Sequence, residues 1–508
     1  YEALNQLMGK PVYASNDQLG GPGIMCPNGV THIRVSNDIE GVNAMLRWLS
    51  YIPRTNKAEL LPQPLSAAVD VIDRPVAFKP TKVAYDVRHL ISGITDESGQ
   101  WISGLFDKDS FMEVLADWAK TVVVGRARLG GIPVGVVATE NRTVEAVIPA
   151  DPAAPQTEES VVQQAGGVWY PDSAYKTAQA IEDINQEGLP LFIIANWRGF
   201  SGGARDMFQE ILKFGSYIVD QLVDFRQPVF VYIPPMAEMR GGAFVVVDSH
   251  INPEVMEMYA DPESRAGVLE PAGVVTIKFR SNDKKEAMIR TDRSLQQIQM
   301  ALSDMSLSKE ARAALLAQQE ARERELQTPY QQVAETFADL HDRADRMQAV
   351  GVIRKVVPLE RARKFFYWRL RRRLIELKIC KEISQVTGKS LDESALLLEE
   401  WFSQSNQHRF SQESQWEDDE VAYHWMEHEQ TDSIFLRINN LKRIMVKEDI
   451  VRLGKENPYT VAEGVLDLLS SLSGEVKERV VSTLKRGVLL RNQSQAEFYE
   501  EDRQFIEF

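Results

Sequence analysis

The chain has 508 residues, too many for a single hydrophobic core, so at least two domains are predicted. Hydrophobic residues make up 44% and charged residues 26%, as in an ordinary soluble globular protein, while a net charge of −15 argues against nucleic-acid binding by the surface as a whole. Two distant cysteines, Cys26 and Cys380, argue against a disulfide framework or thiolate metal site, and no apolar run approaches the roughly 18 residues of a membrane span.

The first part of the chain, residues 1 to about 70, alternates glycine and proline turns with short apolar runs. A helix is predicted from Gly41 to Tyr51, because apolar residues recur on one helical face at Val42, Met45, Leu46 and Leu49. Prolines at positions 53, 62 and 64 follow it. We therefore expect a domain boundary near residue 70.

The next segment begins with a predicted helix from Phe111 to Ala119. Strands are predicted from Thr121 to Val124 and from Ile132 to Val137, separated by a glycine-containing basic turn in which Gly130 to Pro133 closes a hairpin. Residues 150–167 are rich in Pro, Ala and Gln and are typical of a surface loop.

Helices and strands alternate from Ser173 onward. A helix is followed by a strand (189–196), a second helix (205–225), a second strand (228–233), a glycine turn (241–242) and an apolar segment (243–247). This alternation predicts an α/β fold, a sheet layered with helices. After about residue 284 the chain becomes charged and helix-prone, and the run from Lys309 to Gln327 favours a solvated helix or helical hairpin over a coiled coil with a partner.

The stretch from Asn196 to Ala204 places Arg198 among three glycines, directly after an apolar strand. A strand, a glycine turn and a helix aim backbone N–H groups and a fixed cation at one small anionic group. Arginine also offers a planar fork that fits a carboxylate. The residues alone leave this interpretation about even with a simple strand exit that carries a surface arginine.

A second turn of the same kind, Arg240-Gly241-Gly242, follows the strand from Val229 to Ile233. Two successive parallel strands end at the same edge of a sheet, where ligands bind in such folds. Further along, Lys278 and Arg280 flank Phe279 in a predicted strand from Val274, so both would share one face. Two cations on one face suit phosphates, although the solvent face of an edge strand is the more common explanation.

Two other patterns favour ordinary structure. His424 and His428 lie four residues apart without the carboxylate pattern of a metalloprotease, so no metal site is predicted. The run from Arg361 to Arg373 interleaves arginines with Phe365, Phe366, Tyr367 and Trp368, which fits a packed amphipathic helix better than a nucleic-acid surface.

Several long segments together resemble the carboxyltransferase component of multidomain eukaryotic acetyl-CoA carboxylases. The resemblance covers nearly the whole chain and weakens after about residue 385. It rests on Val12–Asn16, Gln18–Gly21, Leu105–Phe111, Val124–Pro133, Ala195–Gly203, Arg240–Gly242, Met256–Ala260, Leu269–Pro271, Ala338–Arg343 and Phe366–Arg373.

The resemblance implies a crotonase-like (ClpP/crotonase) ββα superhelix fold that is used twice. Residues 1–70 would be the C-terminal part of an N domain, residues 71–284 the core of a C domain, and residues 285–508 a long helical extension. The family's working unit is a homodimer whose site lies between the N domain of one protomer and the C domain of another. Its reaction moves a carboxyl group from biotin, held on a carrier domain, to acetyl-CoA, giving malonyl-CoA.

Site roles follow from the same resemblance. Arg198 corresponds to the arginine that recognises the transferred carboxylate, and Gly241 and Gly242 to the glycines whose N–H groups stabilise the ureido oxygen. Lys278 and Arg280 correspond to residues that contact the phosphates of coenzyme A. The biotin and acyl pocket would be lined by Gly199, Phe200, Glu270 and Gly273. No metal and no side-chain nucleophile is implied.

One departure from the family pattern concerns the N-terminus. The family's turns that hold the thioester oxygen lie upstream of Val12, and the chain begins Tyr1-Glu2 without a Met start or signal peptide, so we expect it to be part of a longer protein. Ala204 also stands where the family commonly has Gln.

The alternatives are a propionyl-CoA-type carboxyltransferase and a non-catalytic assembly subunit. The resemblance further implies biotin carboxylase and biotin carrier domains in the same polypeptide, and a cytoplasmic or else plastid location.

Overall fold

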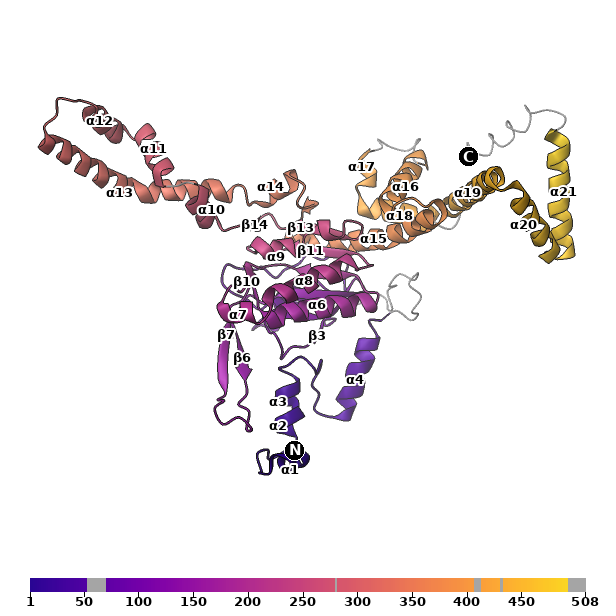
Figure 1. The fold of residues 1–508 in the computed structure, drawn as a ribbon, viewed down its shortest axis with the longest axis horizontal. Helices are drawn as coiled ribbons and strands as arrows, with labels where there is room; N and C mark the ends of the chain where they lie inside the picture. The colour runs from indigo at the N-terminus through magenta and orange to yellow at the C-terminus, as the bar shows by residue number, and fades with distance from the viewer. Residues whose placement is uncertain (53–69, 279–280, 406–412, 430–432, 492–508) are drawn as a thin grey trace. The chain divides into compact units, whose positions relative to one another are not determined.

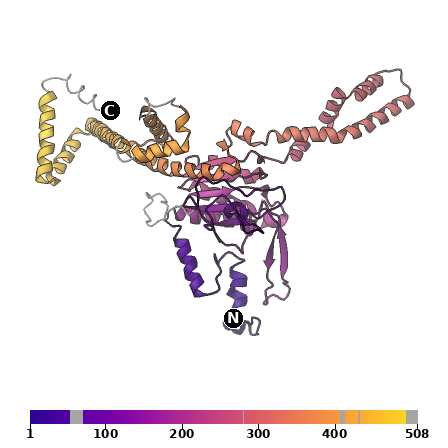
Figure 2. The same cartoon turned by 180° about the vertical axis from the view of Figure 1, so that it is seen from behind.

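The computed structural model describes residues 1–52, 70–278, 281–405, 413–429 and 433–491. The chain forms two compact units, of which one is Tyr1–Lys378 with His408–Tyr423 and the other Ile379–Gln407 with His424–Phe508 (Figure 1; the reverse side is seen in Figure 2). The domain boundaries near residues 70 and 284 stay predictions. Within the described ranges, no helix combines the length and apolarity needed to cross a membrane.

A seven-stranded sheet forms the centre of the first unit, with the strand order β15-β13-β11-β9-β5-β4-β3. Three strands at one side are antiparallel, namely β3 (Met112–Val114), β4 (Val122–Leu129) and β5 (Ile132–Thr139). The others run parallel to β5, namely β9 (Leu191–Ile194), β11 (Val229–Ile233), β13 (Met256–Ala260) and β15 (Lys355–Val356).

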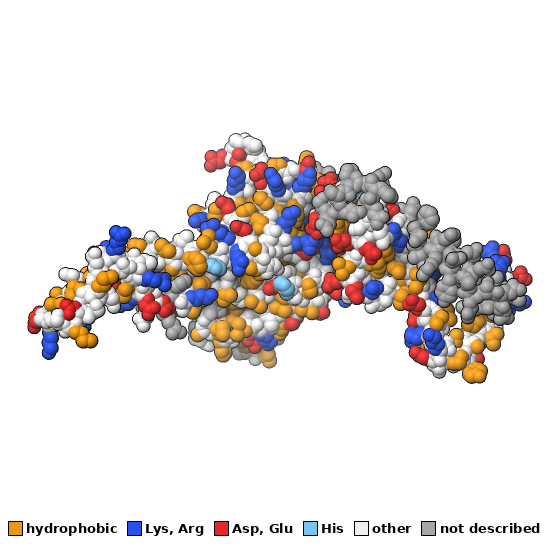
Figure 3. Space-filling view, turned by 90° about the horizontal axis from the view of Figure 1, so that it is seen from above, with side chains coloured by type: hydrophobic (Ala, Val, Ile, Leu, Met, Phe, Trp, Pro, Cys, Tyr) orange, Lys and Arg blue, Asp and Glu red, His pale blue; other side chains and the backbone are white. Residues whose placement is uncertain are grey.

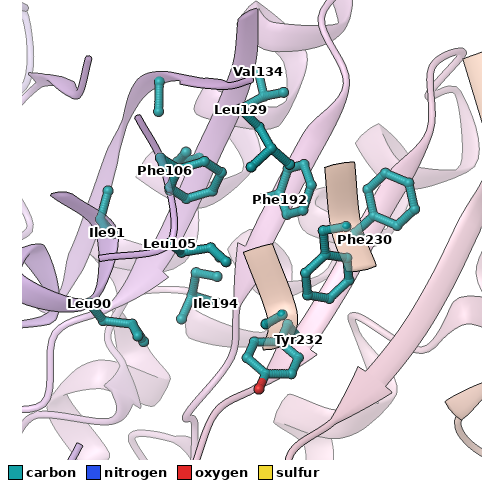
Figure 4. Close-up of a cluster of buried hydrophobic side chains, with 14 of the residues drawn as sticks. Leu90, Ile91, Leu105, Phe106, Leu129, Val134, Phe192, Ile194, Phe230 and Tyr232 are labelled. Carbon is teal, nitrogen blue, oxygen red and sulfur yellow. The ribbon is translucent and has the colours of Figure 1, made fainter. Parts of the chain in front are cut away.

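Helices cover both faces of this sheet. Helix α6 (Pro171–Gln186) packs on one face beside α8 (Ile211–Val223). On the other face lies the first part of α15 (Leu359–Thr387), whose Phe366 ring lies 5.5 Å from Phe192 and 5.3 Å from Tyr232. Figure 4 shows Phe192, Phe230 and Tyr232 within one buried cluster. Strands buried on both faces account for the continuous apolar runs in the sequence.

The region from Phe111 to Ala119 is not a helix, so that prediction is wrong. Residues Met112–Val114 form β3, paired antiparallel with β4, and Leu115 and Ala119 adopt left-handed conformations with φ of 57° and 46°. The predicted hairpin is confirmed, but β4 continues to Leu129 and only Gly130 and Gly131 form the turn.

Two further predictions need partial correction. The predicted helix 205–225 is divided into α7 (Ala204–Phe208) and α8, because Glu210 between them adopts a left-handed φ of 65°. The predicted loop 150–167 contains the strand β7 (Ser160–Gln164), which pairs with β6 (Val144–Ile148).

The predicted N-terminal helix is present as α4 (Asp38–Leu49), capped by the Asn37 side chain. Its apolar face is uncovered, with Met45 and Leu46 each 59% exposed. The prolines that were expected to mark the exit, at 53, 62 and 64, lie outside the described residues.

The charged segment after about residue 284 is helical over its described residues, as predicted. Within it, α13 (Lys309–Asp339) packs against α10 (Pro271–Lys278), α11 (Ser281–Thr291) and α12 (Arg293–Leu302), and an ion pair of 2.9 Å joins Arg322 of α13 to Asp292. The predicted strand from Val274 to Phe279 is wrong over Val274–Lys278, because these residues belong to α10, and Phe279 lies outside the described residues.

The run from Arg361 to Arg373 lies in α15 and is packed, as predicted. Arg363, Arg369 and Arg372 are nevertheless buried, and they pair with Asp107, Glu257 and Asp419. In the space-filling view of Figure 3, acidic and basic side chains are interspersed over the visible face.

The remaining elements are short or lie in the second unit. In the first unit or its edges these are α1 (Glu2–Met8), α2 (Asp17–Gly20), α3 (Pro22–Met25), α5 (Val87–Ser92), β1 (Ile94–Thr95), β2 (Trp101–Ile102), β8 (Val168–Trp169), β10 (Gly199–Phe200), β12 (Glu238–Arg240), α9 (Gly241–Val245), η1 (Ser249–Ile251), β14 (Arg265–Gly267), α14 (Ala344–Ala349) and α17 (Glu413–Trp416). Later helices are α16 (Leu391–Ser405), α18 (Asp419–Glu429), α19 (Phe435–Glu456), α20 (Pro458–Ser471) and α21 (Gly474–Arg491).

Candidate active site

A cavity of about 770 Å³ lies at the carboxyl ends of the parallel strands. Its wall includes residues that closely follow four neighbouring strands: Asn141 after β5, Asn196 and Arg198 after β9, Glu238 after β11 and Glu263 after β13. Since β9 and β11 are adjacent and parallel, the two arginine turns do share one edge of the sheet, as predicted. This is the edge at which open α/β sheets bind ligands.

Arg198 lines this cavity with an exposed side chain. Its backbone N–H donates to the carbonyl oxygen of Gly167 at 2.8 Å, which fixes the start of the turn. In the part of the chain that the structure describes, no carboxylate or hydrogen-bond acceptor engages its guanidinium. The turn thus presents an uncommitted planar cation to whatever enters the cavity.

The other two arginines of the cavity are committed to one carboxylate. Asp339 accepts from Arg265 at 2.7 Å and from Arg343 at 3.3 Å. Burial acts to raise the pKa of Asp339, but these two arginines outweigh it and the pKa is lowered. Asp339 therefore stays ionised and keeps both guanidinium groups occupied.

An aromatic stack supports the Arg198 turn from beneath. Trp197 stacks on Trp169 with ring centroids 4.1 Å apart, and the Phe200 ring centroid lies 5.0 Å from that of Trp169. A Cβ placed on Gly242 would lie 3.5 Å from the Phe200 ring, and one on Gly215 would lie 2.9 Å from it. Phe200 thus packs directly against the second glycine of the second turn.

The second turn differs from the first in what its arginine does. Arg240 is buried, pairs with Asp342 and donates to the carbonyl oxygen of Leu269 at 3.1 Å. Burial raises the pKa of Asp342 by more than Arg240 lowers it. Arg240 is therefore a structural tie, whereas Gly241, with φ of 54°, and Gly242 begin helix α9 beside Phe200.

Among the described residues, the predicted site residues after Gly242 do not line the cavity. Glu270 is exposed, and Gly273 lies in α10 with Leu269 as its nearest neighbour. Lys278 is the exposed last residue of α10, so the shared strand face that first suggested a phosphate site does not exist. Arg280 lies outside the described residues.

Sequence reasoning missed most of the cavity wall. Lys82 and Tyr85 reach it from a loop more than a hundred residues before Arg198, and no local pattern marks them. Burial raises the pKa of Tyr85, so its phenol stays neutral. Asn141 and Asn196 could have been found, because each is a polar residue within two positions of the end of a buried parallel strand.

Comparison with known proteins places the chain in a family. The family model for the carboxyl transferase domain matches residues 1–374, so the chain belongs to the carboxyl transferase family, and its mixed α/β fold is crotonase-like, as the sequence predicted.

The chain is similar to individual proteins as well as to the family model. Acetyl-CoA carboxylase of Saccharomyces cerevisiae is 47% identical over 95% of this chain and 21% of its own length, and a mitochondrial acetyl-CoA carboxylase of the same species is 52% identical over 76% of this chain and 17% of its own length. A solved transcarboxylase 12S with bound methylmalonyl-coenzyme A and methylmalonic acid is 17% identical, covers 72% of this chain and 56% of its own, and has a TM-score of 0.47. The chain spans about a fifth of the length of the curated acetyl-CoA carboxylases that it matches.

Proposed function

We propose that this chain carries out the carboxyltransferase step of an acetyl-CoA carboxylase, in which a carboxyl group moves from carboxybiotin to acetyl-CoA and gives malonyl-CoA for fatty acid synthesis. The observation that carries the proposal is the uncommitted Arg198 guanidinium in a cavity at the sheet edge that also bears the Gly241–Gly242 turn. Similarity to acetyl-CoA carboxylases over 95% of the chain supports it.

The residues of this edge suit the carboxyl and ureido groups of the cofactor. Arg198 can form two parallel hydrogen bonds to a carboxylate, which fix its plane as well as its position. Gly241 and Gly242 lack side chains, so a ligand atom can approach their backbone closely, and the first N–H groups of a helix have no partner within the helix.

These residues define the roles we propose in the reaction. Carboxybiotin, when bound, would supply the carboxyl group, and breaking of its nitrogen–carboxyl bond would leave a ureido nitrogen able to accept the proton that the acetyl methyl group loses. Arg198 holds the carboxylate, and the N–H groups of Gly241 and Gly242 stabilise negative charge on the ureido oxygen. Losing one preorganised donor of this kind costs on the order of 3 kcal/mol in the transition state.

The remaining site residues are proposed on the resemblance. Gly199, Phe200, Glu270 and Gly273 would line the biotin and acyl pocket, and the packing of Phe200 against Gly242 supports its part in this. Lys278 and Arg280 would contact the phosphates of coenzyme A, for which the exposure of Lys278 at the end of α10 is the supporting observation.

The proposal extends to partners and location. The working unit would be a homodimer with a site shared between protomers, served by biotin carboxylase and biotin carrier domains of the same polypeptide, in the cytoplasm or, alternatively, a plastid. Light scattering of the protein at micromolar concentration is expected to give the mass of a dimer, and a monomer would contradict the shared site.

Replacing Arg198 with alanine tests the function directly. In the native polypeptide that contains residues 1–508, Arg198→Ala is expected to lower the rate of biotin-dependent malonyl-CoA decarboxylation at least about tenfold, or roughly 1.4 kcal/mol. Arg205→Ala is the matched control, because this exposed arginine in α7 does not line the cavity. An unchanged rate in Arg198→Ala would contradict the assigned role.

The same assay separates the alternatives. Decarboxylation of malonyl-CoA that is faster than decarboxylation of methylmalonyl-CoA supports the acetyl-CoA assignment, and the reverse order supports the propionyl-CoA type. Absence of activity with either thioester in a folded protein would favour a non-catalytic assembly role.

A further inference from the structure

We propose that Asn196 is a positioning residue that holds the Arg198 turn and the Glu238–Gly242 turn in one fixed relation, so that the two halves of the site act together. This inference rests on the proposed function, because it assigns Asn196 to the same reaction. Asn196 lines the cavity and lies two residues before Arg198. It is distinct from the Arg198 guanidinium and from the Gly241–Gly242 backbone, which are the groups expected to contact the substrate.

The side-chain amide of Asn196 bridges two neighbouring strand ends. Its Oδ1 accepts from the backbone N–H of Glu238 at 2.8 Å, the first residue of β12, which leads into Gly241. Its Nδ2 donates to Oδ1 of Asn141 at 2.6 Å, directly beyond β5. One planar group therefore spans the ends of β5, β9 and the segment after β11.

Backbone contacts make Asn196 the centre of this junction. Its own N–H donates to Oγ1 of Thr139 at 3.0 Å, and the next residue, Trp197, accepts from the N–H of Arg240 at 2.9 Å. The segments 196–197 and 238–240 are thus joined by three hydrogen bonds, because the N–H of Trp197 also donates to Sδ of Met239 at 3.4 Å. Without the Asn196 amide, the backbone bond from Arg240 to Trp197 and the weaker bond to the Met239 sulfur would remain.

An asparagine is the residue that this junction requires, because it offers a donor and an acceptor on one rigid group. Asn196→Ala removes both bonds. Asn196→Asp keeps an acceptor for the N–H of Glu238 but replaces the donor to Asn141 with an oxygen that faces another oxygen. We therefore expect Asn196→Asp to retain more activity than Asn196→Ala.

A double-mutant cycle in the native polypeptide tests the inference, with malonyl-CoA decarboxylation as the readout. We expect Asn196→Ala to lower kcat about tenfold with KM changed less than about threefold, and to lower it by less than about threefold when Arg198 is already alanine, since a residue that acts through Arg198 has little left to act on. Equal losses of kcat in the two backgrounds would overturn the positioning role.

Matched variants separate positioning from stability. Asn252→Ala removes a comparable half-buried amide. Asn252 precedes β13, at the opposite edge of the sheet, and its Nδ2 donates to the carbonyl oxygens of Leu222, Val223 and Phe225. We expect Asn252→Ala to lower the melting temperature without lowering kcat. If Asn196→Ala does not fold, the same cycle is run with Asn196→Asp. A wild-type protein without activity would contradict the proposed function instead.

Discussion

Replacing Lys176 with methionine tests how a strained loop is held. Lys176 of α6 is fully buried, and its Nζ donates to the carbonyl oxygens of Leu115 at 2.8 Å, Trp118 at 2.7 Å and Ala119 at 3.4 Å. Leu115 and Ala119 are the left-handed residues that follow β3. Such conformations persist only where the surroundings fix them.

The size of the expected change in the free energy of unfolding follows from the titration of the Lys176 amine. Burial lowers the pKa of Lys176 from 10.5 to about 7, and the charged groups that act on it are Glu113, Arg88, Asp172 and Asp117. The unfolded chain therefore binds more protons between the two values, so the free energy of unfolding rises with pH across this window. From pH 6 to pH 9 the gain is about 2.7 kcal/mol, at about 1.36 kcal/mol for each pH unit above 7.

The assay is urea unfolding followed by tryptophan fluorescence at pH 6, 7, 8 and 9. The quantity of interest is the difference in unfolding free energy between the wild-type protein and Lys176→Met, because titration elsewhere cancels in it. Lys120→Met, at an exposed lysine, is the control and should show no such trend. A difference that stays constant from pH 6 to pH 9 would refute the reasoning.

Two glycine predictions complete this set. Gly242→Ala is expected to fold normally, because its Cβ would make an ordinary 3.5 Å contact with Phe200, but to lower the rate of decarboxylation about tenfold, because the methyl group obstructs access of the ligand to the backbone. Gly241→Ala should in addition destabilise the fold by about 1–2 kcal/mol, because Gly241 has a left-handed φ. Equal unfolding midpoints for the two variants would contradict this distinction. Gly135→Ala should cost about 1–3 kcal/mol, since its Cβ would lie 2.5 Å from both Cδ1 and Cγ2 of Ile184. In a chain that already carries Ile184→Ala, which lacks both atoms, Gly135→Ala should cost less in thermal unfolding. An equal cost in the two backgrounds would show that the overlap with Ile184 is not the cause.

Local chemistry made parts of the fold predictable. The Gly130–Gly131 hairpin and the two arginine turns at one sheet edge follow from residues that are close in sequence. The failures arose where distant contacts decide. The segment 111–119 carries apolar residues at a helical spacing, but its residues 112–114 pair with β4. The β-branched run after Pro271 is helical because it packs against α13.

The candidate site was predictable to a similar extent. Arg198 and the glycine pair could be found because each follows a strand directly. The burial and pairing of Arg240 could not be predicted, because its partner Asp342 lies about a hundred residues away in the sequence. Nor could the sequence show that Arg265 is committed to Asp339, since only the fold brings these two together, whereas Arg343 pairs with Asp339 from four residues away.

The stack of Trp197 on Trp169 has a spectroscopic consequence. With ring planes only 16° apart and centroids at 4.1 Å, the two indoles are close enough for their electronic transitions to couple. Phe200 lies against Trp169 of this pair and next to Gly242, so a ligand that shifts the Phe200 ring also changes the environment of the indoles. The aromatic stack next to Arg198 thus forms an intrinsic optical reporter, through which occupancy of the site can be followed in the unlabelled protein.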